Sequence, residues 1–116
     1  MSHESNLLEL KTKALEPMIY VCVASTFNLP ELESCLLRRP QYLVLVVSDF
    51  KDIQHGAELF EQQISHVLPG AQILRPDQET QTSFDGRDVS SCLQWVSQTL
   101  LFYLNTLPDL PRVCNI

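Results

Sequence analysis

The sequence has little positive charge: 8 Lys and Arg face 14 Asp and Glu, which gives a net charge of -6. A chain with this balance lacks the diffuse cationic field that duplex DNA or an anionic membrane surface attracts. It also lacks long apolar runs, since those over residues 18–24 and 42–47 fall far short of the about 20 residues of a membrane-spanning helix. We therefore expect a partner that is neither duplex DNA nor a membrane, and local groups that hold any anionic ligand.

Glycine is scarce, and none of the three glycines lies in the loop directly after the first predicted strand. This excludes a Walker loop and a dinucleotide-binding fingerprint there. The cysteines form no CxxC pair and no histidine stands at ligand spacing from them, so we expect no metal and no cofactor. Instead, we expect buried thiols in a reducing cytoplasm, at Cys22, Cys35, Cys92 and Cys114. The N-terminus has polar and acidic residues where a secretory signal would be basic and then apolar, which also favours a cytoplasmic location.

What the chain has is an alternation of strand-like and helix-like apolar patterns over a length that suits one domain. Four strands are predicted, at residues 18–24, 42–47, 71–74 and 112–116. The first two are apolar on consecutive residues, as is typical of parallel strands covered on both faces. The sequence therefore predicts an α/β fold: a Rossmann-like, doubly wound parallel sheet of about four strands with helices on both faces. Residues 1–17 stand outside this pattern as an extension or tail, and residues 18–116 form the domain.

Three helices are predicted between the strands, each with an N-capping residue and an apolar stripe. The first has Asn28 as its cap, with Glu31 bonding back to it, and the stripe Leu32 and Leu36. The second has Asp52 as its cap and ends at Pro69-Gly70, with the stripe Ile53, Ala57, Phe60, Ile64 and Val67. The third has Asp88 as its cap and leaves Trp95 off the stripe, which consists of Val89, Leu93, Val96, Leu100 and Tyr103.

Ligands of open parallel sheets bind outside the carboxyl ends of the strands, so the loops there hold the candidate site. The first loop has two hydroxyls and an amide before a helix start, which attracts anions: Ser25, Thr26, Phe27 and Asn28. The second offers Ser48 and Asp49 to a nucleotide, and the third offers Asp85 and Arg87, whose planar fork suits phosphate. For each loop the alternative is a purely structural cap or turn. No Ser-His-Asp or Cys-His set lies in these loops, so catalytic residues stay unassigned.

Residues 18–116 resemble the N-terminal sensor domain of the CRISPR-associated Rossmann-fold (CARF) nuclease effectors. The resemblance is carried by the segments YVCVASTFNLPELESCLL, LVLVVSDF, LPGAQI, DGRDVSSCLQWV and VCNI. It implies a sheet order of 3-2-1-4 and a homodimer that binds a cyclic oligoadenylate, most often cyclic tetra-adenylate, in type III CRISPR antiviral defence. By position, residues 25–28 match the first ligand loop and Ser48 with Asp49 the second, whereas Asp85 and Arg87 match only a less defined third loop.

In that family the last strand runs into a Thr-Gly-Gly-Thr-Lys loop that grips the ligand, and this sequence ends at Asn115-Ile116, so the resemblance implies an incomplete domain. Three hypotheses follow. The first is a sensor module that binds cyclic oligoadenylate. The second is a slow ring nuclease that cleaves it by positioning a ribose hydroxyl in line with the phosphate. The third is an α/β module with a protein partner. The residues leave the ring size of the ligand open.

Overall fold

The computed structural model describes residues 14–115, so most of the N-terminal extension expected at residues 1–17 lies outside the described part. Four parallel strands form one sheet in the order β3-β2-β1-β4. They are β1 (Glu16–Val23), β2 (Pro40–Val46), β3 (Gln72–Leu74) and β4 (Arg112–Asn115). The predicted α/β class, parallel sheet and strand order are therefore confirmed, and β1 begins two residues earlier than expected.

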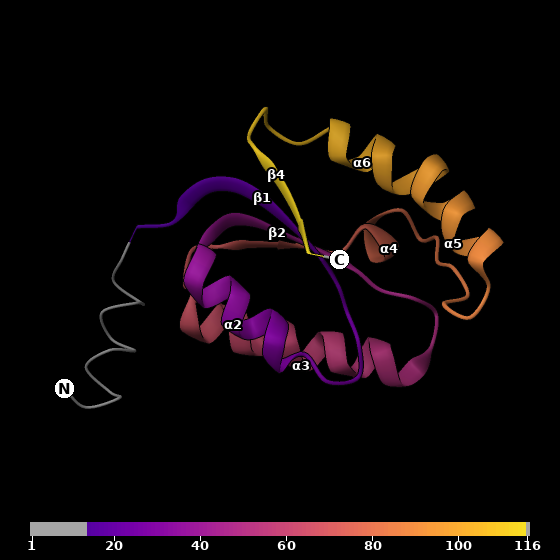
Figure 1. Ribbon diagram of the computed structural model, residues 1–116, viewed down its shortest axis with the longest axis horizontal. Helices are drawn as coiled ribbons and strands as arrows, with labels where there is room; N and C mark the ends of the chain where they lie inside the picture. Colours follow the sequence, from indigo (N-terminus) through magenta and orange to yellow (C-terminus); the bar gives the residue numbers. More distant parts are fainter. Residues whose placement is uncertain (1–13, 116) are drawn as a thin grey trace.

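Helices cover both faces of the sheet, as predicted (Figure 1). One face carries α2 (Leu29–Arg38) and α3 (Lys51–Val67), and the other carries α5 (Val89–Trp95), a π-helical segment η1 (Val96–Leu100) and α6 (Leu101–Asn105). A short helix that the sequence did not predict, α4 (Pro76–Glu79), follows β3. No helix within residues 14–115 is long and apolar enough to cross a membrane.

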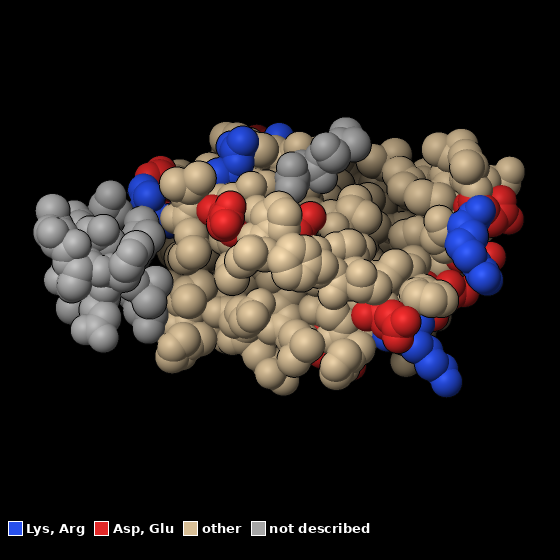
Figure 2. Space-filling view, turned by 60° about the horizontal axis from the view of Figure 1, so that its bottom comes forward, with Lys and Arg blue, Asp and Glu red and all other residues tan. Residues whose placement is uncertain are grey.

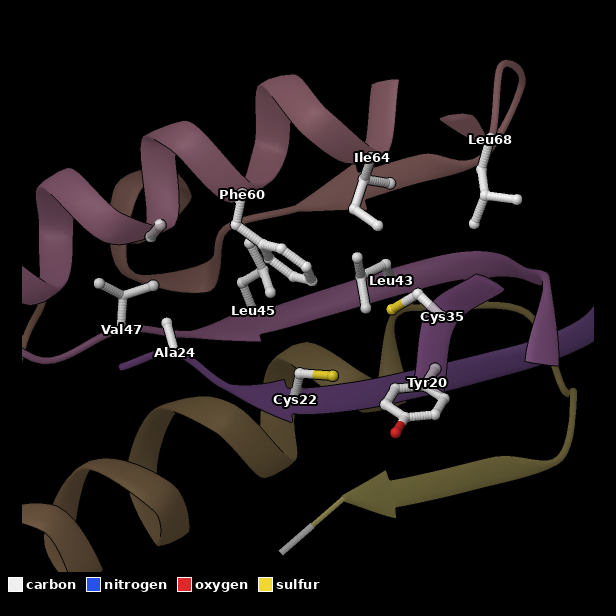
Figure 3. Close-up of a cluster of buried hydrophobic side chains, with 11 residues drawn as sticks. Tyr20, Cys22, Ala24, Cys35, Leu43, Leu45, Val47, Phe60, Ile64 and Leu68 are labelled. Carbon is white, nitrogen blue, oxygen red and sulfur yellow. The ribbon is translucent and has the colours of Figure 1, made fainter. Parts of the chain in front are cut away.

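The two central strands are buried on both sides, which explains why their apolar residues are consecutive. In β1 the side chains of Tyr20 and Cys22 pack toward α2 and α3, whereas Ile19 and Val21 pack toward α5 and α6. On the first side the predicted stripe of α3 fills the core, with Phe60 fully buried among residues of β1, β2 and α2 (Figure 3). The stripe expected for α3 is thus confirmed.

The first helix and the cysteines differ in part from expectation. In α2 the fully buried residue is Cys35, while Leu32 and Leu36 are half-buried against the same core. Cys22 and Cys35 are buried as expected, and the interaction with the Cys35 thiol, together with burial, raises the pKa of the Cys22 thiol. Because Cys92 is half-buried and Cys114 is exposed, the expectation of four buried thiols is wrong for these two.

The predicted stripe of the third helix is confirmed for Val96 and Leu100, but it is wrong for Val89 and Leu93, because the helix is not a regular α-helix throughout. In η1 the N–H of Leu101 bonds to the carbonyl of Val96, five residues back, so one extra residue enters the turn. This turn directs Trp95, Leu100 and Leu104 inward, whereas Val89 and Leu93 are exposed. Trp95 packs against Phe84 with ring centroids 5.0 Å apart and ring planes tilted by 41°, and its Nε1 donates to Thr82.

A buried ion pair fixes the end of β3. The Arg75 guanidinium donates to Asp77 through Nε (2.9 Å) and Nη2 (2.8 Å), and both side chains are at least 94% buried, with exposures of 5% and 6%. Glu61 of α3 lies 3.5 Å from Nη1, an atom that has no hydrogen-bond partner in the described part of the chain. Burial acts to lower the pKa of Arg75, but its hydrogen bonds to Asp77 outweigh burial and raise the pKa, so the guanidinium stays charged. The pair therefore joins β3 to α3 and α4.

Glu61 is expected to make stability depend on pH. Burial raises the pKa of Glu61 despite the nearby Arg75, so the folded protein holds this proton more tightly than the unfolded chain does. The free energy of unfolding should therefore fall as pH rises from the ordinary glutamate pKa, about 4.3, through the raised folded value. Glu61→Gln removes this titration, and urea unfolding across this window should give a flatter profile with no loss at pH 7. An unchanged profile would contradict the assignment.

Candidate functional site

The three predicted ligand loops lie at the carboxyl ends of β1, β2 and β3, and the structure brings the second and third into contact. The N–H of Asp49 donates to the carbonyl of Phe84 at 2.9 Å. Gly86 packs against Ser48 so closely that a Cβ at this position would lie 3.2 Å from Ser48 Oγ. The absence of a side chain at Gly86 therefore lets the two loops meet, and the prediction that Ser48, Asp49 and the 85–87 turn share one region is consistent with this contact.

In the first loop Asn28 holds the N-cap position of α2, as predicted, but its side chain serves the loop and not the helix. Its side chain makes no capping bond to α2; instead, Oδ1 accepts from the N–H of Ser25 (2.9 Å), and Nδ2 donates to the carbonyls of Ser25 (2.9 Å) and Gly56 (3.3 Å). Ser25 Oγ donates to the carbonyl of Phe27 at 2.7 Å. Of the four residues predicted for this loop, Thr26 and Phe27 have exposed side chains that can meet a ligand, and Asn28 holds the loop in place.

Of the caps expected for the other two helices, one is confirmed and one is wrong. Asp88 caps α5 as predicted, since its side chain accepts from the N–H of Ser90. Asp52 is not the cap of α3: the cap position is Phe50, two residues earlier than expected, and Asp52 lies in the first turn of the helix. The first N–H groups of α2 and α3 are therefore without side-chain caps at the carboxyl edge of the sheet.

The first loop packs directly against α3 at Gly56, which has no side chain. A Cβ at Gly56 would lie 2.6 Å from the backbone oxygen of Ser25, too close for any contact without movement. Gly56→Ala should therefore destabilise the protein by about 1–3 kcal/mol through overpacking, although alanine favours helix by about 1 kcal/mol. Thermal unfolding measures this, with Gln54→Ala on the same helix as the control. A stabilised Gly56→Ala variant would contradict the close contact.

Between these loops and η1 lies an apolar cavity of about 410 Å³, a volume typical of small-molecule sites. It opens at the carboxyl ends of β1 and β2, beside the end of β4, where the sheet reverses its winding order. Its lining comes from β1, β2, β4, α3, α5, η1 and the loops, and consists of Val21, Val23, Ala24, Val46, Ser48, Ile53, Phe84, Gly86, Cys92, Val96, Leu100 and Cys114. We call this space the edge cavity.

Ser48 gives the edge cavity an unsatisfied hydrogen-bonding group that a ligand could use. It is only 5% exposed, and its Oγ has no hydrogen-bond partner within residues 14–115. A buried hydroxyl without a partner costs about 1–3 kcal/mol, so a ligand that bonds to it gains that amount in addition to apolar contact. The edge cavity therefore suits a flat, largely apolar group with a hydrogen-bonding edge.

Charges of both signs surround this region. Figure 2 shows basic and acidic side chains side by side at the end of the molecule where α3 and α5 begin. The middle of the face in this view is mostly uncharged. Arg87 lies outside the edge cavity with its side chain 83% exposed, and its Nε bonds to Asp85 at 3.3 Å. The backbone N–H and the side chain of Arg87 lower the pKa of Asp85, which keeps this carboxylate charged beside the guanidinium. Arg87 is thus a partly neutralised cation.

Sequence reasoning found Ser48 but missed the other walls of the edge cavity. Val96 and Leu100 stood on the predicted apolar stripe, but nothing in the spacing indicated that Cys92 and Cys114 would line the cavity beside them, or that a π-turn lies at residues 96–100. Chemically, the arrangement can bind a neutral ring in the edge cavity and an anionic group near the exposed loops. Comparisons with protein-family models, with curated proteins and with solved structures found no match to this chain.

Proposed function

We propose that this chain is a binding module for a cyclic oligoadenylate, acting as a dimer in type III CRISPR antiviral defence. The observation that carries the proposal is the unpartnered, buried hydroxyl of Ser48 in the apolar edge cavity. A nucleobase has flat apolar faces and a hydrogen-bonding edge, which are the two properties that this cavity selects. Thr26 and Phe27, exposed beside the start of α2, support a role of the first loop in contacting the phosphates or a second base.

The charge around the site shapes how such a ligand would bind. The chain carries a net charge of -6, and Asp49 and Asp52 stand exposed where α3 begins. The phosphates therefore gain little from the long-range field, and burial of the base supplies most of the affinity. In this respect the module differs from nucleic-acid-binding proteins, whose affinity falls steeply as salt is added.

Calorimetric titration of the full chain with cyclic tetra-adenylate tests the proposal, with cyclic hexa-adenylate to define ring size. Cyclic tetra-uridylate is the matched control, because it carries the same charge with a different base. We expect binding that is at least about tenfold tighter for the adenylate ring, and little change between low and moderate salt. No heat of binding, or equal affinity for both rings, would contradict the proposal. Linear product after incubation would assign the ring nuclease instead.

Two substitutions in the third loop test the electrostatic part. Arg87→Ala removes the exposed cation and should weaken binding of cyclic tetra-adenylate. Asp85→Asn removes the carboxylate that engages Arg87, so it should strengthen binding by leaving the guanidinium for a phosphate. Calorimetry measures both. If neither substitution changes the affinity, Arg87 and Asp85 lie outside the binding site.

A further inference from the structure

The edge cavity holds a second chemistry that the proposed function does not use, because two thiols line it. Cys92 comes from α5 and Cys114 from β4. In the sheet Cys114 pairs with Val21, whose side chain packs toward α5 and α6, so Cys114 lies on the same side of the sheet as Cys92. The two sulfur-bearing residues therefore face one apolar space from different elements.

These two cysteines differ from the other pair in access. Cys92 is half-buried and Cys114 is exposed, whereas Cys22 and Cys35 are completely buried in the core on the other face. A thiol reacts as its thiolate, so a cysteine must be reachable and able to ionise. The interaction with the Cys35 thiol, together with burial, raises the pKa of Cys22, which opposes its ionisation. Reactivity is therefore expected at the edge cavity and not in the core.

We propose that the edge cavity is a modification site for small, apolar α,β-unsaturated carbonyl compounds. The apolar walls concentrate such a compound, and the unpartnered Ser48 hydroxyl donates a hydrogen bond to its carbonyl oxygen. This bond draws electron density from the β-carbon. The thiolate of Cys92 or Cys114 then forms a C–S bond to that carbon, and the proton released by the thiol goes through solvent to the α-carbon. No leaving group, oxidant or reductant is needed.

The class of compound follows from the lining. A charged reagent would have to lose its hydration on entering apolar walls, whereas an apolar ring gains from burial. The group that accepts from Ser48 must be a neutral carbonyl and not a carboxylate, because the cavity lining, in the part of the chain that the structure describes, offers no counterion. The proposal uses the cavity, the hydroxyl and the thiols alone, so it stands or fails separately from cyclic oligoadenylate binding.

The experiment compares two maleimides with the same reactive ring on the full chain without any nucleotide. N-phenylmaleimide is apolar, and 3-maleimidopropionate carries a carboxylate. Rates are divided by those with N-acetylcysteine, and the labelled residues are mapped by mass spectrometry. We expect a normalised preference of at least about tenfold for the phenyl compound, as burial of a ring predicts, with label on Cys92 or Cys114 and none on Cys22 or Cys35. Equal normalised rates, or equal labelling of the core cysteines, would overturn the proposal.

Ser48→Ala tests the role of the hydroxyl. It should lower the rate with N-phenylmaleimide several-fold, and Ser90→Ala, an exposed serine of α5, should leave it unchanged. An unchanged rate in Ser48→Ala would overturn activation by Ser48. The comparison of the two reagents on the unsubstituted chain decides the apolar binding step even if Ser48→Ala folds poorly.

Discussion

Replacing Asp77 by alanine is expected to lower the free energy of unfolding by about 3–5 kcal/mol. The carboxylate accepts two bonds from Arg75, and both side chains are almost fully buried. Without it, the guanidinium stays inside the protein with Glu61 at 3.5 Å as its one remaining ion-pair partner within residues 14–115, and Nη1 has no hydrogen-bond partner there. An unpaired buried charge is the costly outcome, more so than loss of the pair itself. Equilibrium unfolding in urea at pH 7 measures the change.

The chain contains a matched control. Asp85 pairs with Arg87 at the same sequence separation, but those side chains are 41% and 83% exposed. Water solvates Arg87 once the carboxylate is gone, so Asp85→Ala should leave stability unchanged within error. Equal losses of stability in Asp77→Ala and Asp85→Ala would show that burial of the Arg75 pair does not set its cost.

Filling the edge cavity should abolish measurable binding of cyclic tetra-adenylate. Val96 is half-buried on η1 and lines the cavity, so the extra atoms of Val96→Phe extend into this space. They occupy the place of the base, and the expected loss of affinity is at least about a hundredfold, or 2.7 kcal/mol. Calorimetry with the unsubstituted chain as reference measures it, and circular dichroism checks the fold.

Ser97→Phe controls for the new ring. Ser97 is the next residue of η1, but it is exposed and does not line the edge cavity. This variant should bind with unchanged affinity, because the added ring points to solvent. Retained affinity in Val96→Phe, or an equal loss in both variants, would place the ligand elsewhere.

Much of the fold could be predicted because local pattern and long-range packing agree in its central elements. Strands β1 and β2 are apolar on consecutive residues since helices cover both faces, and α3 keeps a regular stripe through Phe60 and Ile64. The predicted buried face of the third helix was partly wrong for one physical reason. The π-turn at residues 96–100 adds a residue and turns Trp95 inward, and a search for a 3.6-residue period cannot detect the added residue.

The site could be predicted only as far as the strand ends locate it. The loop residues follow from the rule that ligands meet the carboxyl edge of a parallel sheet. Two features depend on contacts between distant segments: the side chain of Asn28 bonds to Gly56 instead of capping α2, and Cys114 shares a cavity with Cys92. No spacing along the chain encodes these meetings. Likewise, the sequence places Arg75 and Asp77 in a loop and gives no sign that the fold buries them.

The most direct test of the account is a methyl NMR spectrum of valine-labelled protein during addition of cyclic tetra-adenylate. A base in the edge cavity would shift the methyl signals of Val23 and Val96 through its ring current and leave Val67, which packs against the opposite core, in place. Binding of a base in the edge cavity should give this pattern, with shifts that saturate as ligand is added. Shifts confined to Val67, or none at saturating ligand, would contradict it.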